Sequence, residues 1–250
     1  KKLGISDDLS PVLSMSLGAG ETTLSRLTTA YAMLVNGGKK IKPSLIDRVQ
    51  NRNGKTLSKH DNRVCLNCSQ EQWDETVEAK IVDNRDQLID PVNAHQIVSM
   101  LEGAVIRGTG KKVSVLKKPL AGKTGTTNES NDTWFVGFSP DLVVGIFVGF
   151  DTPKSLGLRE TGASVASPIF RDFMQLALHN KEVPPFRIPS RAKLIKINLK
   201  TGKLANKNDK NIILEYFAPG TEPNNDKNSN NIYRNKTTNI KNIIGLGGLY

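Results

Sequence analysis

One stretch in the middle of the chain constrains the fold most, because it alternates β-rich runs with short polar turns. Lys123-Thr124-Gly125-Thr126-Thr127 is approached by an apolar run, Val113 to Leu116. Two further β-rich runs follow, at Asp132 to Gly137 and at Leu142 to Phe150. Three strands separated by polar turns predict an antiparallel meander.

The side chains of the first strand suit the binding of an extended, negatively charged peptide. Lys123 supplies a fixed positive charge, and the hydroxyls of Thr124 and Thr126 can hold a carboxylate. Gly125 leaves room for a peptide, and a glycine within a strand usually marks the close approach of another backbone, so we expect something to lie against it. The backbone N–H of Thr126 can donate to an oxyanion. The alternative is a polar edge strand with no ligand.

Several segments, in order along the chain, carry a resemblance to a known family. They are Leu17 to Glu21 with the helical run Thr22 to Ala32 and Asn36-Gly37-Gly38, then Lys123-Thr124-Gly125, Asp132 to Asp141, and Phe217 to Pro223. Over roughly residues 3 to 222 the chain resembles the class A penicillin-binding proteins, the bifunctional enzymes that polymerise and cross-link peptidoglycan.

The resemblance implies a fold, an activity and a set of partners. The fold is α/β (α+β), with an antiparallel sheet flanked by helices as in penicillin-binding transpeptidases and β-lactamases, here incomplete at its N-terminus. The activity is acyl transfer, in which a serine attacks a D-Ala-D-Ala carbonyl and the acyl group passes to an amine of a neighbouring strand. The implied partners are the peptidoglycan stem peptide, β-lactams and a missing N-terminal part of the same protein. The implied location is the periplasmic side of the bacterial inner membrane, with the anchor outside this chain, and no cofactor is expected.

The nucleophile that this family needs is not found where the resemblance requires it. A Ser-x-x-Lys and a Ser-x-Asn motif should both precede Lys123. We reject the literal matches Ser114 to Lys117, Ser190 to Lys193, and Ser229-Asn230-Asn231, because the first adjoins the Lys123 strand and the others lie in the C-terminal region. We therefore expect no catalytic residue in this chain and no transpeptidase activity from it alone. Because the chain starts at Lys1 without a signal peptide or long apolar stretch, we expect it to be part of a longer protein.

Two other functions remain open at the level of sequence. One is a non-catalytic remnant or scaffold from a split or truncated gene. The other is a serine β-lactamase-like hydrolase, which shares the Lys-Thr-Gly strand but matches Trp134 to Asp141 less well.

The remaining segments predict one domain and an extension. We place the C-terminal part of a transpeptidase domain at 1–183, with an insertion at 59–87. Asn53-Gly54 predicts a hairpin between Ile41 to Asn51 and Lys55 to Ser58. Helices are expected after Thr22 or Thr23, after Asp90 as the N-cap with Pro91 in the first turn, and over Ser164 to Leu178. The connection after the second helix offers Arg107, Thr109 and Lys111 as contacts to a cleft, or else a solvated loop.

The two cysteines, Cys65 and Cys68, are spaced Cys-x-x-Cys inside the expected insertion. One such pair gives at most two metal ligands, and His60, His95 and His179 are scattered, so no metal site is predicted. A local disulfide is the preferred interpretation, and zinc, redox catalysis and free thiols are the alternatives.

The net charge of +11 is concentrated near the C-terminus. Residues 184–250 hold 12 Lys and Arg against 4 Asp and Glu, a net +8, and they contain 12 Asn. We interpret 184–250 as a basic Asn/Lys-rich extension that is partly disordered. Without aromatic platforms or a recognition fold, we expect no nucleic-acid partner.

Overall fold

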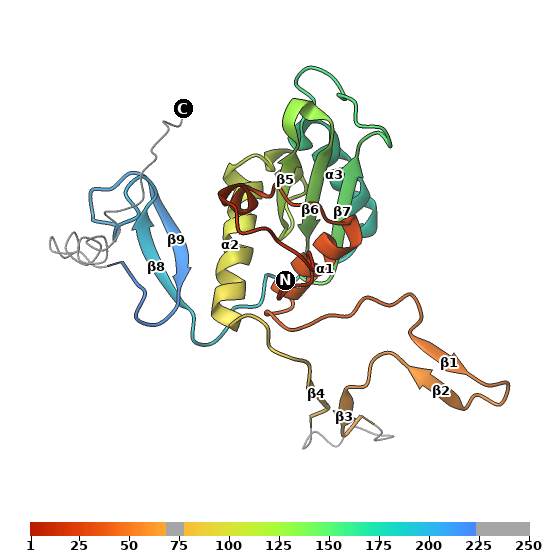
Figure 1. Cartoon of the computed structure of the whole chain (residues 1–250). Coiled ribbons are helices and arrows are strands. Elements are labelled where there is room, and N and C mark those ends of the chain that lie inside the picture. Colours follow the sequence, from red (N-terminus) through yellow and green to blue (C-terminus); the bar gives the residue numbers. More distant parts are fainter. Residues whose placement is uncertain (69–77, 224–250) are drawn as a thin grey trace. The chain divides into compact units, whose positions relative to one another are not determined.

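A three-stranded antiparallel sheet forms the centre of the first 190 residues in the computed structural model, which describes residues 1–68 and 78–223 (Figure 1). The strands are β5 (Ala121–Thr126), β6 (Thr133–Phe138) and β7 (Val143–Val148), hydrogen-bonded in the order β5-β6-β7. The short turns between them leave only antiparallel pairing, as the meander pattern predicts. The combination of an antiparallel sheet with flanking helices confirms the expected fold class.

Helices pack on both faces of this sheet (Figure 1). α1 (Leu24–Val35) covers one face so closely that a side chain on Gly145 would collide with Thr28. α3 (Ser167–Ala177), entered through the π-helical turn η4 (Gly162–Ala166), covers the other face. Its Phe170 is fully buried, and its ring centroid lies 4.7 Å from that of Phe135 on β6.

The helix starts follow the expected capping chemistry. The Thr23 side chain accepts a hydrogen bond from the backbone N–H of Arg26 at the start of α1. α2 (Pro91–Arg107) begins after Asp90, whose carboxylate accepts from the N–H groups of Val92 and Asn93. These side chains satisfy backbone donors that the first helical turn leaves without partners.

The apolar run at 113–116 is not an extended approach to β5. It lies in the 3-10 helix η2 (Lys111–Leu116), with Val113 fully buried in the core beside α3. A run of four residues, three of them apolar, is too short for periodicity to distinguish a strand from a helical turn. Two further 3-10 turns are η1 (Leu13–Leu17) and η3 (Asn128–Ser130).

Two small strand pairs occupy the segment between α1 and α2. β1 (Arg48–Gln50) pairs with β2 (Thr56–Lys59), and Gly54 in their turn has φ 78°, which confirms the predicted hairpin. β3 (Val64–Leu66) pairs with β4 (Lys80–Val82) inside the expected insertion. Every residue of these four strands is exposed.

The second compact unit begins at Arg191. It contains an antiparallel pair, β8 (Lys193–Asn198) and β9 (Ile212–Phe217), which our interpretation of the basic extension did not include. The first unit continues to Ser190 and thus takes in residues 184–190, with Phe186 buried in its core.

Candidate functional site

β5 presents the predicted substrate-binding residues in alternating directions. Successive side chains of a strand point to opposite faces of a sheet, so Lys123 lies on one face, and Thr124 and Thr126 lie on the other. β5 is an edge strand, because in the described ranges no other strand pairs with its outer side. Such an edge offers backbone N–H and C=O groups to an extended peptide.

Lys123 keeps most of its binding capacity for a ligand. Its side chain is exposed, and its Nζ donates one hydrogen bond, 2.8 Å long, to the carbonyl oxygen of Thr124. Over the residues that the structure describes, it forms no ion pair. The ammonium therefore has two of its three N–H donors and its full charge free for an anion.

The hydroxyl of Thr124 is held by the loop after α2. Its Oγ1 lies 2.9 Å from the Oγ1 of Thr109, so the two hydroxyls share a hydrogen bond. This contact ties Thr109 to the strand, and the contact of Arg107, Thr109 and Lys111 with a cleft stays a prediction. Arg107 ends α2 and Lys111 begins η2, one on each side of that loop position. On α2 itself, burial raises the pKa of the Glu102 carboxyl, and the Arg107 charge opposes that rise.

The hydroxyl of Thr126 is held by the turn that leads into α3. The backbone N–H of Gly162 donates a 3.0 Å hydrogen bond to Oγ1 of Thr126. Since that oxygen accepts from Gly162, its own proton is free to point toward a ligand.

The neighbour expected for Gly125 is another glycine of this chain. A Cβ atom on Gly162 would lie 2.6 Å from the carbonyl oxygen of Gly125 and 2.5 Å from that of Trp134. Only a residue without a side chain allows these backbones to approach so closely. Sequence reasoning missed Gly162, and the only local signal was the capping box formed by Thr161 and Ser164 just before an apolar run.

The turn that follows β5 is locked in an uncommon conformation. Glu129 and Ser130 have φ values of 59° and 55°, a region that residues with a side chain adopt rarely. Ser155 Oγ donates to the carbonyl oxygen of Glu129 over 2.8 Å, and the N–H of Leu156 donates to that of Ser130 over 3.0 Å. The end of β5 is therefore tied to the loop that follows β7.

The literal nucleophile motifs have no catalytic arrangement in the described residues. Ser114 lies in η2, where its Oγ donates to the carbonyl oxygen of Lys111 over 2.8 Å, and Lys117 follows with a left-handed φ of 52°. Lys193 forms an ion pair with Glu222. Ser229-Asn230-Asn231 lies outside the described residues.

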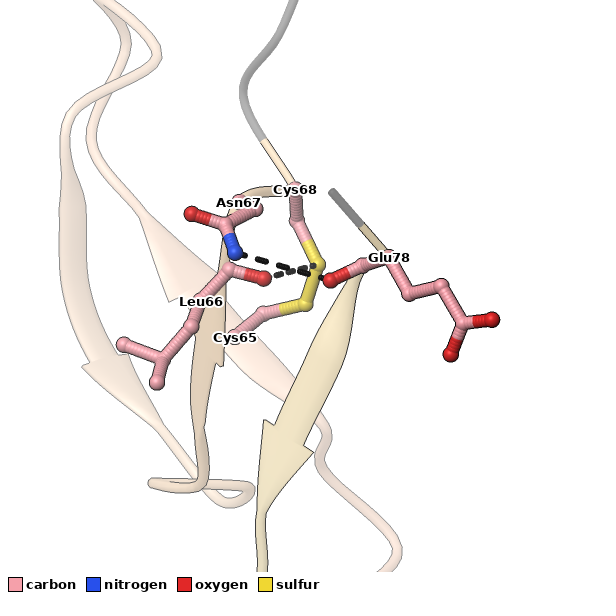
Figure 2. Close-up of a disulfide and its surroundings, with 5 residues drawn as sticks. All are labelled: Cys65, Leu66, Asn67, Cys68 and Glu78. Carbon is pink, nitrogen blue, oxygen red and sulfur yellow. Dashed lines mark hydrogen bonds between the residues drawn. A yellow bond between two sulfur atoms is a disulfide. The ribbon is translucent and has the colours of Figure 1, made fainter. Parts of the chain in front are cut away.

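Cys65 lies in β3 and Cys68 in the turn that follows it, and the two are joined as a disulfide in Figure 2, with their Cα atoms 5.7 Å apart. The Asn67 side chain between them reaches the carbonyl oxygen of Glu78 at 3.5 Å. Among the described residues, no group of three or more His, Cys, Asp or Glu side chains could hold a metal ion. The oxidation state of the pair stays a prediction.

The same described ranges contain no helix of the length and apolarity that a bilayer crossing requires.

Comparison with known proteins assigns the part of the chain that contains β5 and its flanking helices to one family. The model of the penicillin-binding protein transpeptidase domain matches residues 9–175. Penicillin-binding protein 1A of Rickettsia conorii is 46% identical over 208 residues, which are 82% of this chain and 26% of that protein. The protein of the same name from Aquifex aeolicus is 34% identical over 223 residues, 89% of this chain and 28% of that protein. The chain thus spans about a quarter of the length of these curated relatives.

A solved structure agrees with the sequence relatives. The crystal structure of penicillin-binding protein 1A from Haemophilus influenzae superposes with a TM-score of 0.74 at 29% identity. The match covers 89% of this chain and 36% of that one.

Proposed function

The chain belongs to the penicillin-binding protein transpeptidase family, and from that premise we propose that it supplies the substrate-binding wall of a serine D,D-transpeptidase that cross-links peptidoglycan stem peptides. The observation that carries the proposal is the edge strand β5, with a free ammonium at Lys123 and two hydroxyls, of Thr124 and Thr126, whose orientation other segments fix.

Each wall residue has a defined task in this proposal. The donor peptide lies along the outer edge of β5. Although Lys123 and the threonines start on opposite faces, the Lys123 ammonium bends back to the Thr124 carbonyl, and there it holds the terminal carboxylate together with the threonine hydroxyls. The backbone N–H of Thr126 donates to the carbonyl oxygen as it becomes an oxyanion. Gly125 allows the turn at Gly162 to approach the strand, and that turn holds the Thr126 hydroxyl.

The chemistry is acyl transfer in two steps. In the first step a serine oxygen bonds to the carbonyl carbon of the penultimate D-Ala, and an ester forms. The terminal D-Ala leaves through its amine, which takes the serine proton. An acceptor amine then attacks the ester, the serine oxygen departs with the amine proton, and a new amide forms. A β-lactam replaces the donor when its ring opens onto the same serine.

In this proposal the serine, its lysine and the Ser-x-Asn motif come from a segment that is not in this chain. That segment is the partner that completes the site, and this chain alone is inactive. The assembled enzyme acts on the periplasmic side of the inner membrane, and its anchor also lies outside the chain. Residues 1–183 act as the C-terminal part of the transpeptidase domain, 184–190 complete the same compact unit, and the rest of the basic extension is appended to it.

A second candidate, a non-catalytic remnant or scaffold, is favoured by one observation. Ser114 is engaged in its own 3-10 turn, and Lys193 is paired with Glu222, so the literal Ser-x-x-Lys motifs give no nucleophile.

Covalent labelling with a fluorescent penicillin tests the two candidates. We expect labelling of a chain extended N-terminally through the adjoining Ser-x-x-Lys, and none of the 250-residue chain. In the extended form, Lys123→Ala should slow labelling by at least about tenfold, because a charge-assisted contact of about 1.5–3 kcal/mol is lost. Lys112→Ala is the matched control, because it removes an exposed lysine outside β5. Labelling of neither chain would support the remnant, and labelling of the short chain would contradict both.

A further inference from the structure

A polar hollow of about 430 Å³ lies away from β5, in the segment between α1 and α2. Three stretches line it: Lys40 to Lys42, His60 to Arg63, and Asn84 to Asp86. No residue of β5 takes part. The second and third stretches are the two ends of the insertion expected at 59–87. A volume of this size is within the range of small-ligand sites.

The two ends of the insertion carry the same tripeptide in the same conformation. Asp61-Asn62-Arg63 precedes β3, and Asp83-Asn84-Arg85 follows β4. In the first, Arg63 donates from Nε and a terminal nitrogen to its aspartate, over 2.9 and 2.6 Å. In the second, Arg85 does the same over 2.8 and 2.7 Å. Both guanidinium groups are therefore fixed in place, and each keeps other N–H donors.

The charge around the hollow has a small positive excess. The lining cations are Lys40, Lys42, Arg63 and Arg85, and the lining carboxylates are Asp61 and Asp86. Arg85 is also paired with Asp83, which does not line the hollow and which pairs with Lys39 as well, so the count with these partners is five cations against three carboxylates. Lys40 is paired with Asp86 over 3.3 Å. Lys42 is exposed and forms no ion pair with any described residue, whereas Lys40, Arg63 and Arg85 are each paired with an aspartate.

We propose that this hollow is a second binding site, which holds the carboxylate end of a peptide on Lys42 and the two fixed arginines. The unpaired ammonium of Lys42 matches one carboxylate, whereas the Asp61 and Asp86 carboxylates of the lining oppose a multiply charged phosphate. The side-chain amides of Asn62 and Asn84 can pair with peptide groups beside that carboxylate. Within the proposed function, on which this assignment of the peptide rests, the ligand is a stem peptide held away from the catalytic strand.

The test measures binding of a synthetic peptide ending in D-Ala-D-Ala to the full 250-residue chain by isothermal titration. We expect the free-carboxylate peptide to bind, and the same peptide with a C-terminal amide to bind at least about tenfold more weakly, because the charge-assisted bonds are lost. Lys42→Gln should cause the same loss. Lys55→Gln, at an exposed turn position outside the hollow, is the matched control and should bind as the unchanged chain does. Both variants change exposed side chains, and circular dichroism checks that they fold.

A third variant separates this inference from the proposed function. Lys123→Gln should leave binding at the hollow unchanged. If Lys123→Gln abolishes binding and Lys42→Gln does not, the peptide sits on β5, which overturns the second site and supports the proposed function. If the amide peptide or inorganic phosphate binds as tightly as the free-carboxylate peptide, the assignment of the hollow to a peptide carboxylate is also overturned. Loss with Lys42→Gln alone would support the second site even if penicillin labelling of the extended chain failed.

Discussion

At the scale of single residues, Gly162 is the position where one added methyl group should disturb the wall most. Its Cβ would meet two backbone carbonyl oxygens at 2.5 and 2.6 Å, so Gly162→Ala requires the backbone to shift. We expect it to lower the free energy of unfolding by about 1–3 kcal/mol, the usual cost of overpacking. Urea unfolding followed by circular dichroism measures this change.

Gly125→Ala is the comparison for that prediction. Its Cβ would first meet the Cβ atom of Trp134, at 3.2 Å, which is a milder overlap than the 2.5 and 2.6 Å contacts at Gly162. The stability loss should therefore be smaller than for Gly162→Ala. If Gly125→Ala costs as much stability as Gly162→Ala, or more, then the close approach of η4 to β5 is not what limits packing around Gly125.

The proposed wall residues were predicted from sequence alone, because Lys123 to Thr126 are adjacent and their chemistry is local. The groups that orient them could not. Thr109 and Gly162 reach the strand from 15 and 36 positions away, and only the tertiary fold brings them to Thr124 and Thr126. One of them, Gly162, acts through its backbone N–H, which every residue except proline has.

At the scale of elements, an ion-pair cluster joins the residues just after α1 to those just before α2. Asp83 is paired with Lys39 and with Arg85. Hydrogen bonds from Arg85, and then from Lys39, hold the pKa of Asp83 well below its usual range, while burial opposes them. A carboxyl whose pKa falls on folding stabilises the protein fully above its unfolded pKa, about 3.9. That contribution is lost as the pH falls below this value toward the folded pKa.

Asp83→Asn should therefore lower the free energy of unfolding by about 1 kcal/mol at neutral pH. The difference from the unchanged chain should shrink as the pH is lowered from about 5 to about 3. Urea unfolding across that range measures it, and Asp86→Asn is the control, because its pair with Lys40 is far more exposed. A pH-independent difference would mean that Asp83 acts through packing rather than through its charge.

The elements that sequence predicted best were those with chemical end signals. Asp90 and Pro91 mark the start of α2, and Asn53-Gly54 marks the β1–β2 turn. The run at 113–116 lacked such a signal, and it became a 3-10 helix because Val113 packs into the core beside α3. β8 and β9 were hidden in a composition rich in Lys and Asn, which outweighed the short alternation in Lys193–Asn198.

At the scale of the whole molecule, the position where the first unit ends has a consequence for its stability. The unit continues to Ser190, and Phe186 packs edge-on against Phe138, with ring centroids 5.7 Å apart and only 8% of its surface exposed. Phe138 pairs with Ala121 at the start of β5. The support of β5 therefore reaches past residue 183.

Two truncated chains test this argument. A chain ending at Ser190 should unfold in urea like the first unit of the full chain, whereas one ending at Val183 should be less stable by about 3 kcal/mol, the cost of deleting a buried phenylalanine. Phe186→Ala in the longer truncation should reproduce most of that loss, which separates the side chain from the rest of 184–190. Equal stability of the two truncations would place the end of the folded unit at 183, and would mean that Phe186 contributes nothing to the base of β5.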